Sequence, residues 1–396
     1  MNYQTEEKLD RFPVALFALF FLFYAGQAIY NTYVNLYLSS VGLSGTQIGI
    51  IVSVSTVGIL CAQLFWGLVS DRTKTKNSVL RLLYAATAII ALAFYLNSSF
   101  LFLAAAVTLF SVFFHPLMPL QDNFALEYLE NKRWDYGQVR IGGTIGYCLT
   151  VLVIGFFLQD DYRPIFFMVA VFMTICRLIC LKLPKIEGFR TKENKSSYWE
   201  LLKNKPLAGL ILFNLTFSIG LNFYHNFYAI YFTSDAVGGN SSLVGIMMFA
   251  SSVSEIPMLM LIHRITEKIG IKKTLVVAGS VTALRWLLLF FLKTPGLIVP
   301  VNLLHGIGYT SFSYYIITYI GKTVPKDMRA TGQTLNVLIG NVVSRVLFGL
   351  VGGFISEYMG ADKMMLFSSV LIGAGTVIFV IWSRKIKEFS EGTNLC

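Results

Sequence analysis

Long apolar runs alternate with short polar segments along the whole sequence. A helix needs about 20 predominantly apolar residues to cross a bilayer, and twelve runs are about that long or longer. We expect one transmembrane helix in each run, at residues 13–38, 47–69, 78–96, 100–129, 137–158, 164–183, 206–233, 242–263, 273–291, 297–321, 331–356 and 364–383. The pattern predicts an all-α membrane protein.

The composition supports this prediction and narrows the function. Of the 396 residues, 55% are hydrophobic and only 13% are charged, whereas soluble proteins carry roughly 25% charged and 45–50% apolar residues. A soluble enzyme cannot bury such an excess, so that class is excluded, together with disordered, collagen-like and disulfide-framework proteins. The five cysteines show no Cys-x-x-Cys spacing and are expected to be small buried apolar residues rather than metal ligands.

The basic residues indicate how the chain is oriented. Of the 32 Lys and Arg residues, 25 lie on the same side as the N-terminus, in loops or at the ends of predicted helices; four lie deeper within predicted helices, and only Arg163, Lys293 and Lys363 lie opposite. Because short cytoplasmic loops are enriched in Lys and Arg, we expect a multi-pass protein of the cell (inner) membrane with both termini in the cytoplasm. The net charge of +11 then reflects orientation rather than nucleic-acid binding.

The predicted helices fall into two halves of six. The longest cytoplasmic connection is the linker 184–205, which separates an N-terminal bundle at 1–183 from a C-terminal bundle at 206–396. A faint repeat supports this division, since basic segments around Asp71 and Glu267 follow the second and the eighth helix. Two such halves, with the substrate site between them, are typical of carriers that work by alternating access.

Prolines and glycines are expected to shape individual helices. Four prolines should bend the helices that contain them, because proline removes a backbone hydrogen bond. They are Pro116, Pro119, Pro257 and Pro300. Two Gly-x-x-x-Gly pairs, which start at Gly142 and Gly349, should let neighbouring helices approach closely.

Ionisable side chains within the predicted helices are the first candidates for a functional site, because a charge in the bilayer interior is costly unless it is paired or hydrated. They are Asp122, Arg140, His225, Glu255, Arg285, His305 and Arg345. Asp122 and Arg140 lie at similar depth on consecutive helices. They would either bind solute hydroxyls or a solute carboxylate through the Arg fork, or form an ion pair that only ties the helices together.

Amide side chains mark two further helix faces. Gln27, Asn31 and Asn35 recur every four residues in the first predicted helix and therefore share one face. Asn222 and His225 form a similar patch in the seventh helix. Amides are unfavourable in lipid, so we expect both faces to line a solute cavity; the alternative is hydrogen bonding between helices.

The chain resembles the major facilitator superfamily over its whole length. The segment after the second helix, with Gly67 and the pair Asp71-Arg72, is similar to the cytoplasmic signature of that superfamily, although Lys74 stands where a second glycine is usual. The resemblance implies twelve helices in two six-helix halves. It also implies a cytoplasmic gate that involves Asp71 and Arg72.

Residues of the first half resemble the lactose-permease-like branch, which includes oligosaccharide:proton symporters and phenylpropionate permeases. Arg140 follows the pair Tyr136-Gly137, and Asp122 lies on the preceding helix. In that branch such an acid and arginine bind the sugar, and an aromatic residue at the place of Tyr147 stacks on it. The resemblance therefore implies that Asp122, Arg140 and Tyr147 bind substrate.

The second half adds the pairs Arg285-Trp286 and Leu304-His305, which are similar to pairs in the same branch. There, the arginine and the histidine belong to the proton and substrate machinery. The proton carboxylate of that branch lies three residues after the histidine, where this chain has Gly308. Its role cannot be transferred to that position.

Glu255 is the only well-embedded acid of the C-terminal half, and we expect it to carry the proton. A carboxylate holds its proton in an apolar setting and releases it beside a cation. Movement of Glu255 between an apolar setting and Arg285 or His305 would therefore load and release a proton in each cycle. The alternative is a structural polar residue near Pro257.

These features predict a secondary active transporter that couples inward proton flow to the uptake of a small polar solute, sugar-like or a nucleoside. One alternative is uptake of an aromatic carboxylate, because Arg345 has no acid close to it in sequence and an anion would balance its charge. Another is a drug/proton antiporter of the same fold, although the first helix carries amides rather than acids. No P-loop, HExxH or GxSxG motif supports an ATP-driven pump or a hydrolase.

The expected protein is a monomer, not an enzyme, without cofactor or metal, whose partners are the solute, protons and the lipid bilayer, with no nucleic acid. The expected substrate-binding residues are Gln27, Asn31, Asn35, Asp122, Arg140, Tyr147, Asn222, His225, Arg285 and Arg345. The expected proton-coupling residues are Glu255, His305 and Arg285.

Overall fold

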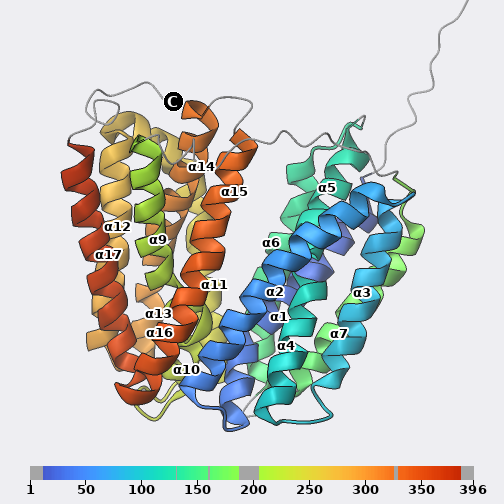
Figure 1. The fold of residues 1–396 in the computed structure, drawn as a ribbon, viewed down its shortest axis with the longest axis horizontal. Coiled ribbons are helices and arrows are strands. Elements are labelled where there is room, and N and C mark those ends of the chain that lie inside the picture. The colour runs from blue at the N-terminus through green and yellow to red at the C-terminus, as the bar shows by residue number, and fades with distance from the viewer. Residues whose placement is uncertain (1–11, 131, 159–160, 187–204, 325–328, 385–396) are drawn as a thin grey trace, which may run out of the picture. The chain divides into compact units, whose positions relative to one another are not determined.

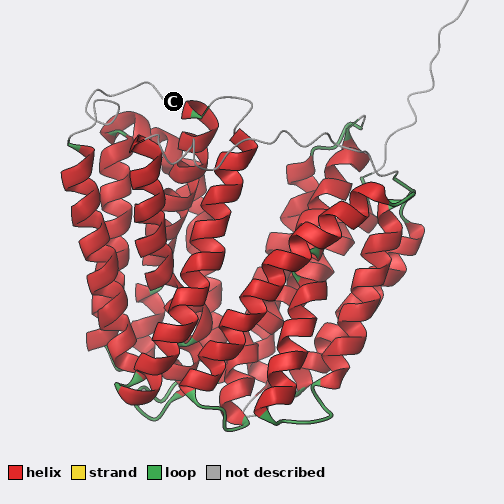
Figure 2. Cartoon of the chain, in the orientation of Figure 1, coloured by secondary structure: helices red, strands yellow, loops and turns green. Residues whose placement is uncertain are grey.

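The computed structural model describes residues 12–130, 132–158, 161–186, 205–324 and 329–384. Within these ranges every regular element is a helix and none is a strand (Figure 2). The chain forms two compact units. As far as they are described, the first unit comprises Met1–Tyr30, Gly58–Thr150 and Arg163–Thr191, and the second comprises Asn31–Val57, Val151–Tyr162 and Lys192–Cys396.

Seven helices of the described residues contribute to the first unit. They are α1 (Val14–Ser40), α2 (Gly45–Arg72), α3 (Lys76–Ala93), α4 (Phe100–Phe114), α5 (Leu117–Leu129), α6 (Tyr136–Leu158) and α7 (Pro164–Lys182). The chain passes between the units within α1, α2 and α6, because the division falls after Tyr30, Val57 and Thr150. In the first unit, α3 packs along α7 and also contacts α4 and α5 (Figure 1).

The second unit contains the remaining parts of α1, α2 and α6 and all the later elements that the structure describes. These are α9 (Lys205–Asn226), α10 (Tyr228–Thr233), α11 (Ser241–Ile269), α12 (Ile271–Phe291), α13 (Pro295–Val301), η1 (Gly306–Thr310), α14 (Ser311–Thr323), α15 (Arg329–Val337), η3 (Leu338–Val343), α16 (Ser344–Tyr358) and α17 (Ala361–Ser383). η1 and η3 are π-helical. α17 packs against α12 and α9 (Figure 1), and η1 packs against α11 and α12.

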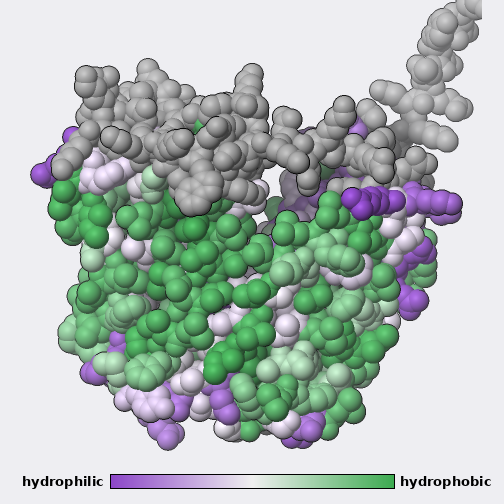
Figure 3. Space-filling model, viewed as in Figure 1, coloured by the Kyte–Doolittle hydropathy of each residue, from purple (hydrophilic) through white to green (hydrophobic). Residues whose placement is uncertain are grey.

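Eleven helical stretches of the described residues are long and apolar enough to cross a membrane. They coincide with eleven of the twelve predicted spans, and the prediction of an all-α membrane protein is confirmed. The predicted span 297–321 is present but divided among α13, η1 and α14, so no single helix there reaches the necessary length. Apolar side chains cover the helix surfaces between more hydrophilic ends (Figure 3), as lipid contact requires.

Some helix breaks follow the prolines and others do not. Pro116 separates α4 from α5, and Pro300 lies one residue before the end of α13, as a missing backbone donor favours. Pro257 lies inside α11, which continues through it. The predicted single span 206–233 is wrong in this detail, because the chain leaves the helix at Phe227, where φ is −125°, before α10 begins.

Candidate functional site

The first unit brings Asp122 and Arg140 into contact. Asp122 lies on α5, which begins just after Pro116, and Arg140 lies one turn after Tyr136, the first residue of α6. Arg140 Nε is 3.7 Å from Asp122 Oδ1, and the Tyr136 hydroxyl donates a 2.8 Å hydrogen bond to the same oxygen. Both contacts stabilise an ionised carboxylate.

Arg140 also contacts aromatic residues of α1. Its Nη2 atom donates a hydrogen bond to the Tyr24 hydroxyl, and its Cζ atom lies 4.0 Å from the centre of the Tyr24 ring and 5.7 Å from that of Phe20. The side chains of Arg140 and Asp122 are 24% and 25% exposed. The cluster therefore combines a cation, an acid and an aromatic ring, of which the two charged groups can reach a solute.

Glycines of α6 allow α1 to approach this closely. A Cβ atom on Gly143 would lie 2.7 Å from Cδ2 of Tyr24 and 2.9 Å from Nη1 of Arg140. A Cβ atom on Gly146 would lie 2.9 Å from the carbonyl carbon of Phe21. The close helix approach expected from the glycine pair that begins at Gly142 is therefore present, and it lets Tyr24 contact Arg140.

The second unit joins Glu255, His305 and Arg285 in one chain of contacts. Glu255 lies on α11, Arg285 on α12, and His305 immediately precedes η1. His305 Nε2 is 3.6 Å from Glu255 Oε1, and His305 Nδ1 is 2.9 Å from Arg285 Nη1. Arg285 Nη2 donates a 2.5 Å hydrogen bond to Asn302 Oδ1. Arg285 is 1% exposed and the Glu255 side chain is 33% exposed, so Glu255 is the accessible member of this set of three contacting side chains.

The hydrogen-bonding groups assign the tautomer of His305. A guanidinium has only donors, so His305 Nδ1 accepts from Arg285, and the ring hydrogen must lie on Nε2, directed toward Glu255. The ring is also stacked between Tyr224 and Tyr309, at centroid distances of 5.3 and 5.0 Å. A neutral imidazole thus connects a buried cation with a half-buried acid.

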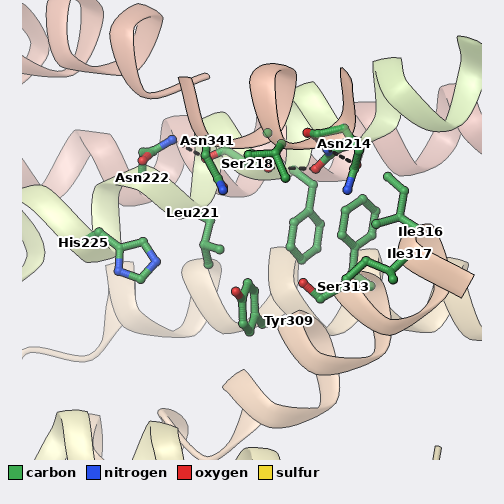
Figure 4. Close-up of a pocket in the computed structure, with 15 residues that line it drawn as sticks. Asn214, Ser218, Leu221, Asn222, His225, Tyr309, Ser313, Ile316, Ile317 and Asn341 are labelled. Carbon is green, nitrogen blue, oxygen red and sulfur yellow. Dashed lines mark hydrogen bonds between the residues drawn. The ribbon is translucent and has the colours of Figure 1, made fainter. Parts of the chain in front are cut away.

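A pocket of about 280 Å³ lies within the second unit, next to the contacts formed by Glu255, His305 and Arg285 (Figure 4). It is enclosed by α9, by η1 with α14, and by α15 with η3. Asn222 and His225, which the sequence predicts to bind solute, line it, and so does Tyr309, the residue that stacks on His305. The polar patch of the seventh span therefore faces a cavity rather than lipid.

The other predicted binding residues lie outside these clusters. Gln27 belongs to the first unit, whereas Asn31 and Asn35 belong to the second. Asn35 is buried, and the other two are half-buried. Tyr147 is half-buried on α6, two turns after Arg140.

Arg345 and the two residues of the predicted cytoplasmic gate are the remaining residues that the sequence predicts to be functional. Arg345, on α16, donates a 3.5 Å hydrogen bond to Asn226 Oδ1. Arg72 is exposed at the end of α2, and the side chain of Asp71 lies outside the described part, so this gate stays a prediction. Among the described residues, no group of three His, Cys, Asp or Glu side chains could hold a metal ion.

Several residues that line the pocket were not among the binding residues predicted from the sequence. Asn214 and Ser218 precede Asn222 at intervals of four, so the criterion applied to the first span would have found them on the same face of α9. Asn336 and Asn341 are five residues apart, a spacing that an ideal α-helix places on different faces. They share the pocket because the helix becomes π-helical at η3, and no sequence pattern indicated this change.

The fold and these buried polar clusters define a multi-pass membrane protein of the kind that carries small solutes. A family model described as the MFS_1 like family matches residues 14–367. The match spans most of the chain, so the chain belongs to this family, and its predicted membership of the major facilitator superfamily is confirmed. Family and relatives are transporters, which makes this protein a membrane transporter rather than an enzyme.

Three known proteins illustrate the similarity. The "Uncharacterized transporter YwbF" of Bacillus subtilis (strain 168) is 27% identical, over 87% of this chain and 87% of its own. The maltose permease of Geobacillus stearothermophilus is 23% identical, over 96% of each chain. A crystal structure of a mutant of the nucleoside transporter NupG has the same fold, with a TM-score of 0.85 and 20% identity over 93% of this chain and 99% of that one.

Proposed function

We propose that this protein is a proton-coupled symporter that carries a sugar-like compound or a nucleoside across the cell (inner) membrane by alternating access. The contact chain of Glu255, His305 and Arg285 is the observation that carries the proposal. Two relatives support the solute class, since one is a permease for maltose and another a transporter of nucleosides.

Glu255 is the proton carrier in this proposal. Arg285 occupies Nδ1 of His305, so the imidazole offers Glu255 only a donor. That donor stabilises the ionised carboxylate, and its loss on a small movement of α11 or η1 favours the protonated form. Proton binding at Glu255 is thereby coupled to helix position, which is what a symporter requires.

Asp122 and Arg140 are the solute-binding pair of the first unit. The Tyr136 hydroxyl and Arg140 both contact Asp122, so this acid is suited to staying ionised and accepting hydrogen bonds from solute hydroxyls. The Tyr24 ring packs against the Arg140 guanidinium and the Tyr24 hydroxyl accepts its hydrogen bond, which holds the arginine beside Asp122. The two acids therefore take different roles because their partners differ.

Transport by purified protein in liposomes tests the coupling. Uridine and maltose are offered as labelled solutes with and without an imposed inward proton gradient, and counterflow is measured separately. Glu255→Gln should abolish gradient-driven accumulation yet retain counterflow, because exchange of solute needs no net proton movement.

The matched control is Glu267→Gln, which changes an exposed acid on the same helix and should leave both activities unchanged. If Glu255→Gln still accumulates solute in response to the proton gradient, the proton assignment is wrong. If Arg140→Ala, which removes the predicted solute cation of the first unit, leaves the affinity for the transported solute unchanged, the role of the Asp122–Arg140 pair is wrong.

A further inference from the structure

The pocket of the second unit is lined by uncharged side chains apart from one histidine. Its polar lining consists of amides and hydroxyls on one side, with Tyr309 and Ser313 opposite them and His225 between (Figure 4). Among the residues that the structure describes, the lining contains no Asp, Glu, Lys or Arg side chain. A solute carboxylate would meet no cation in this described lining, and burying an unpaired charge is costly. The pocket is therefore suited to an uncharged ligand.

Part of the amide hydrogen-bonding capacity is used within the protein. Asn214 Nδ2 donates to Asn336 Oδ1 at 2.8 Å, and its Oδ1 accepts from Ser218. Asn222 Nδ2 donates to the Ser218 carbonyl and to the Ser344 hydroxyl. These bonds connect the amide side chains of α9 with α15 and with the first residue of α16.

The rest of that capacity faces the pocket. In the part of the chain that the structure describes, Asn222 Oδ1, Asn336 Nδ2 and the amide of Asn341 make no hydrogen bond. Asn222 and Asn336 are each 8% exposed, so their available amide atoms belong to the pocket, whereas Asn341 is exposed and also lines the pocket. One acceptor, one donor and a complete amide are thus available to a ligand, which is the complement of several hydroxyl groups.

Apolar walls complete the pocket. The rings of Phe217 and Phe312 stack on each other at 4.1 Å, and both residues line the space together with Tyr309. Phe217 and Phe312 are 1% and 3% exposed, so they form a closed apolar wall, beside which a few placed polar groups can fix the orientation of a ligand. The combination fits a ring that carries hydroxyls.

Both π-helical segments that the structure describes in the second unit meet at this pocket. Tyr309 comes from η1, and Gly340 and Asn341 come from η3. A Cβ atom on Gly340 would lie 2.7 Å from Asn214 Nδ2, so the position leaves room only for glycine beside the amide pair. π-helical turns are rare and frequently mark functional sites. Two of them around one polar cavity favour ligand binding over simple packing.

We propose that this pocket binds an uncharged, hydroxyl-bearing ring of the solute, with Asn222, Asn336 and Asn341 as its hydrogen-bonding residues. The inference rests on the proposed function, because it takes the ligand to be the transported solute. It favours sugars and nucleosides over the aromatic carboxylate that the sequence left open. Asn341 is the specificity-determining residue that can be tested most cleanly, because it makes no hydrogen bond to the described protein.

Equilibrium binding to the purified full-length protein tests the pocket without any transport step. The uncharged probes are uridine, adenosine, maltose and sucrose, and the anionic probe is 3-phenylpropionate. At least one uncharged probe should bind, and Asn341→Ala should weaken it by about 3- to 10-fold, the loss expected for one hydrogen bond. Asn97→Ala, at an exposed position of the first unit, is the matched control and should leave the affinity unchanged.

Whether a sugar or a nucleoside binds, the proposal is supported, and the probe identifies the subclass. It is overturned if none of the four uncharged probes binds, if 3-phenylpropionate binds more tightly than all of them, or if Asn341→Ala leaves the affinity intact. Thermal unfolding of each variant shows that the fold is retained. A probe that binds through Asn341 but is not driven by a proton gradient contradicts only the proposed function, not this pocket.

Discussion

At the scale of single residues, Arg285 determines the chemistry of its neighbours. It is 1% exposed, and within the described residues no carboxylate oxygen lies within 4.0 Å of it. Its charge is instead shared with neutral acceptors, His305 and Asn302, and with the faces of Tyr224 and Trp286. Arg285 therefore needs His305 Nδ1 as a hydrogen-bond acceptor. This hydrogen bond fixes the imidazole in an orientation in which Nε2 faces Glu255.

Replacing His305 with phenylalanine should destabilise the protein. The ring would still stack between Tyr224 and Tyr309, but Arg285 Nη1 would lose its acceptor in a buried place. An unsatisfied buried donor costs about 1–3 kcal/mol, and more when it is charged. Thermal unfolding in detergent should show a clear loss for His305→Phe and little change for His263→Phe, which alters an exposed histidine of α11. Equal stability of the two variants would contradict the assigned role.

Gly143→Ala should weaken solute binding in the first unit. The new methyl group would lie 2.7 Å from the Tyr24 ring and 2.9 Å from Arg140 Nη1, so both side chains must move. Gly137→Ala is the control on the same helix, because nothing lies within 4 Å of its added Cβ atom. Alanine is favoured over glycine in a helix by roughly 0.5–1 kcal/mol, so this control should be as stable as the parent or more so. Comparable solute affinities for the two variants would exclude a role for the Tyr24–Arg140 contact.

The residue types of both clusters could be predicted from the sequence, but their partners could not. An ionisable side chain in an apolar run carries a cost that only function or pairing offsets, and this criterion selects Asp122, Arg140, Glu255, Arg285 and His305. It does not reveal that Tyr24 covers Arg140, because that contact joins helices 116 residues apart in sequence. Nor does it reveal that Asn302 accepts from Arg285, because this contact depends on how α12 and the end of α13 pack. Aromatic and amide residues in a membrane protein are too common to indicate such pairs on their own.

At the scale of elements, the length of the apolar runs predicted the membrane spans correctly, but the sequence predicted only some of the places where the helices within them are interrupted. The bilayer thickness sets the number of apolar residues directly, so the spans follow from the sequence, and prolines account for two of the breaks. The break at Phe227 and the π-helical turns η1 and η3 have no comparable signal. They depend on how neighbouring helices pack, as where Gly306 donates its N–H to the Ser254 hydroxyl at 2.9 Å.

The π-helical element η1 connects the pocket with the contacts of Glu255, His305 and Arg285. Tyr309 is the residue of η1 that takes part in both. Its ring lines the pocket and stacks on His305 at 5.0 Å, with an interplanar angle of 8°. An aromatic pair contributes about 0.5–1.5 kcal/mol. Tyr309→Leu should therefore lower proton-driven accumulation of solute by about 2- to 10-fold relative to counterflow.

Tyr309→Phe keeps the ring and should couple almost as well as the parent protein. The measurement is the ratio of accumulation under a proton gradient to counterflow, in the same liposome preparation. If the leucine and phenylalanine variants give the same ratio, the stack does not link the pocket to Glu255.

At the scale of the whole molecule, the charge distribution predicts an orientation that helix packing alone does not determine. Twenty-five of the 32 basic residues lie on one side of the predicted spans, and retention of Lys and Arg in the cytoplasm orients short loops. Lys74, after α2, and Asp235, between α10 and α11, are exposed and fall on opposite sides in this prediction.

Cysteine labelling of whole cells tests this orientation. In a background without the native cysteines, Asp235→Cys should react with a membrane-impermeant maleimide applied outside, whereas Lys74→Cys should react only after the cells are permeabilised. Each variant is the control for the other, because expression and reagent are the same. The reverse pattern would place both termini outside, and proton entry at Glu255 would then have to be assigned to the opposite direction of transport.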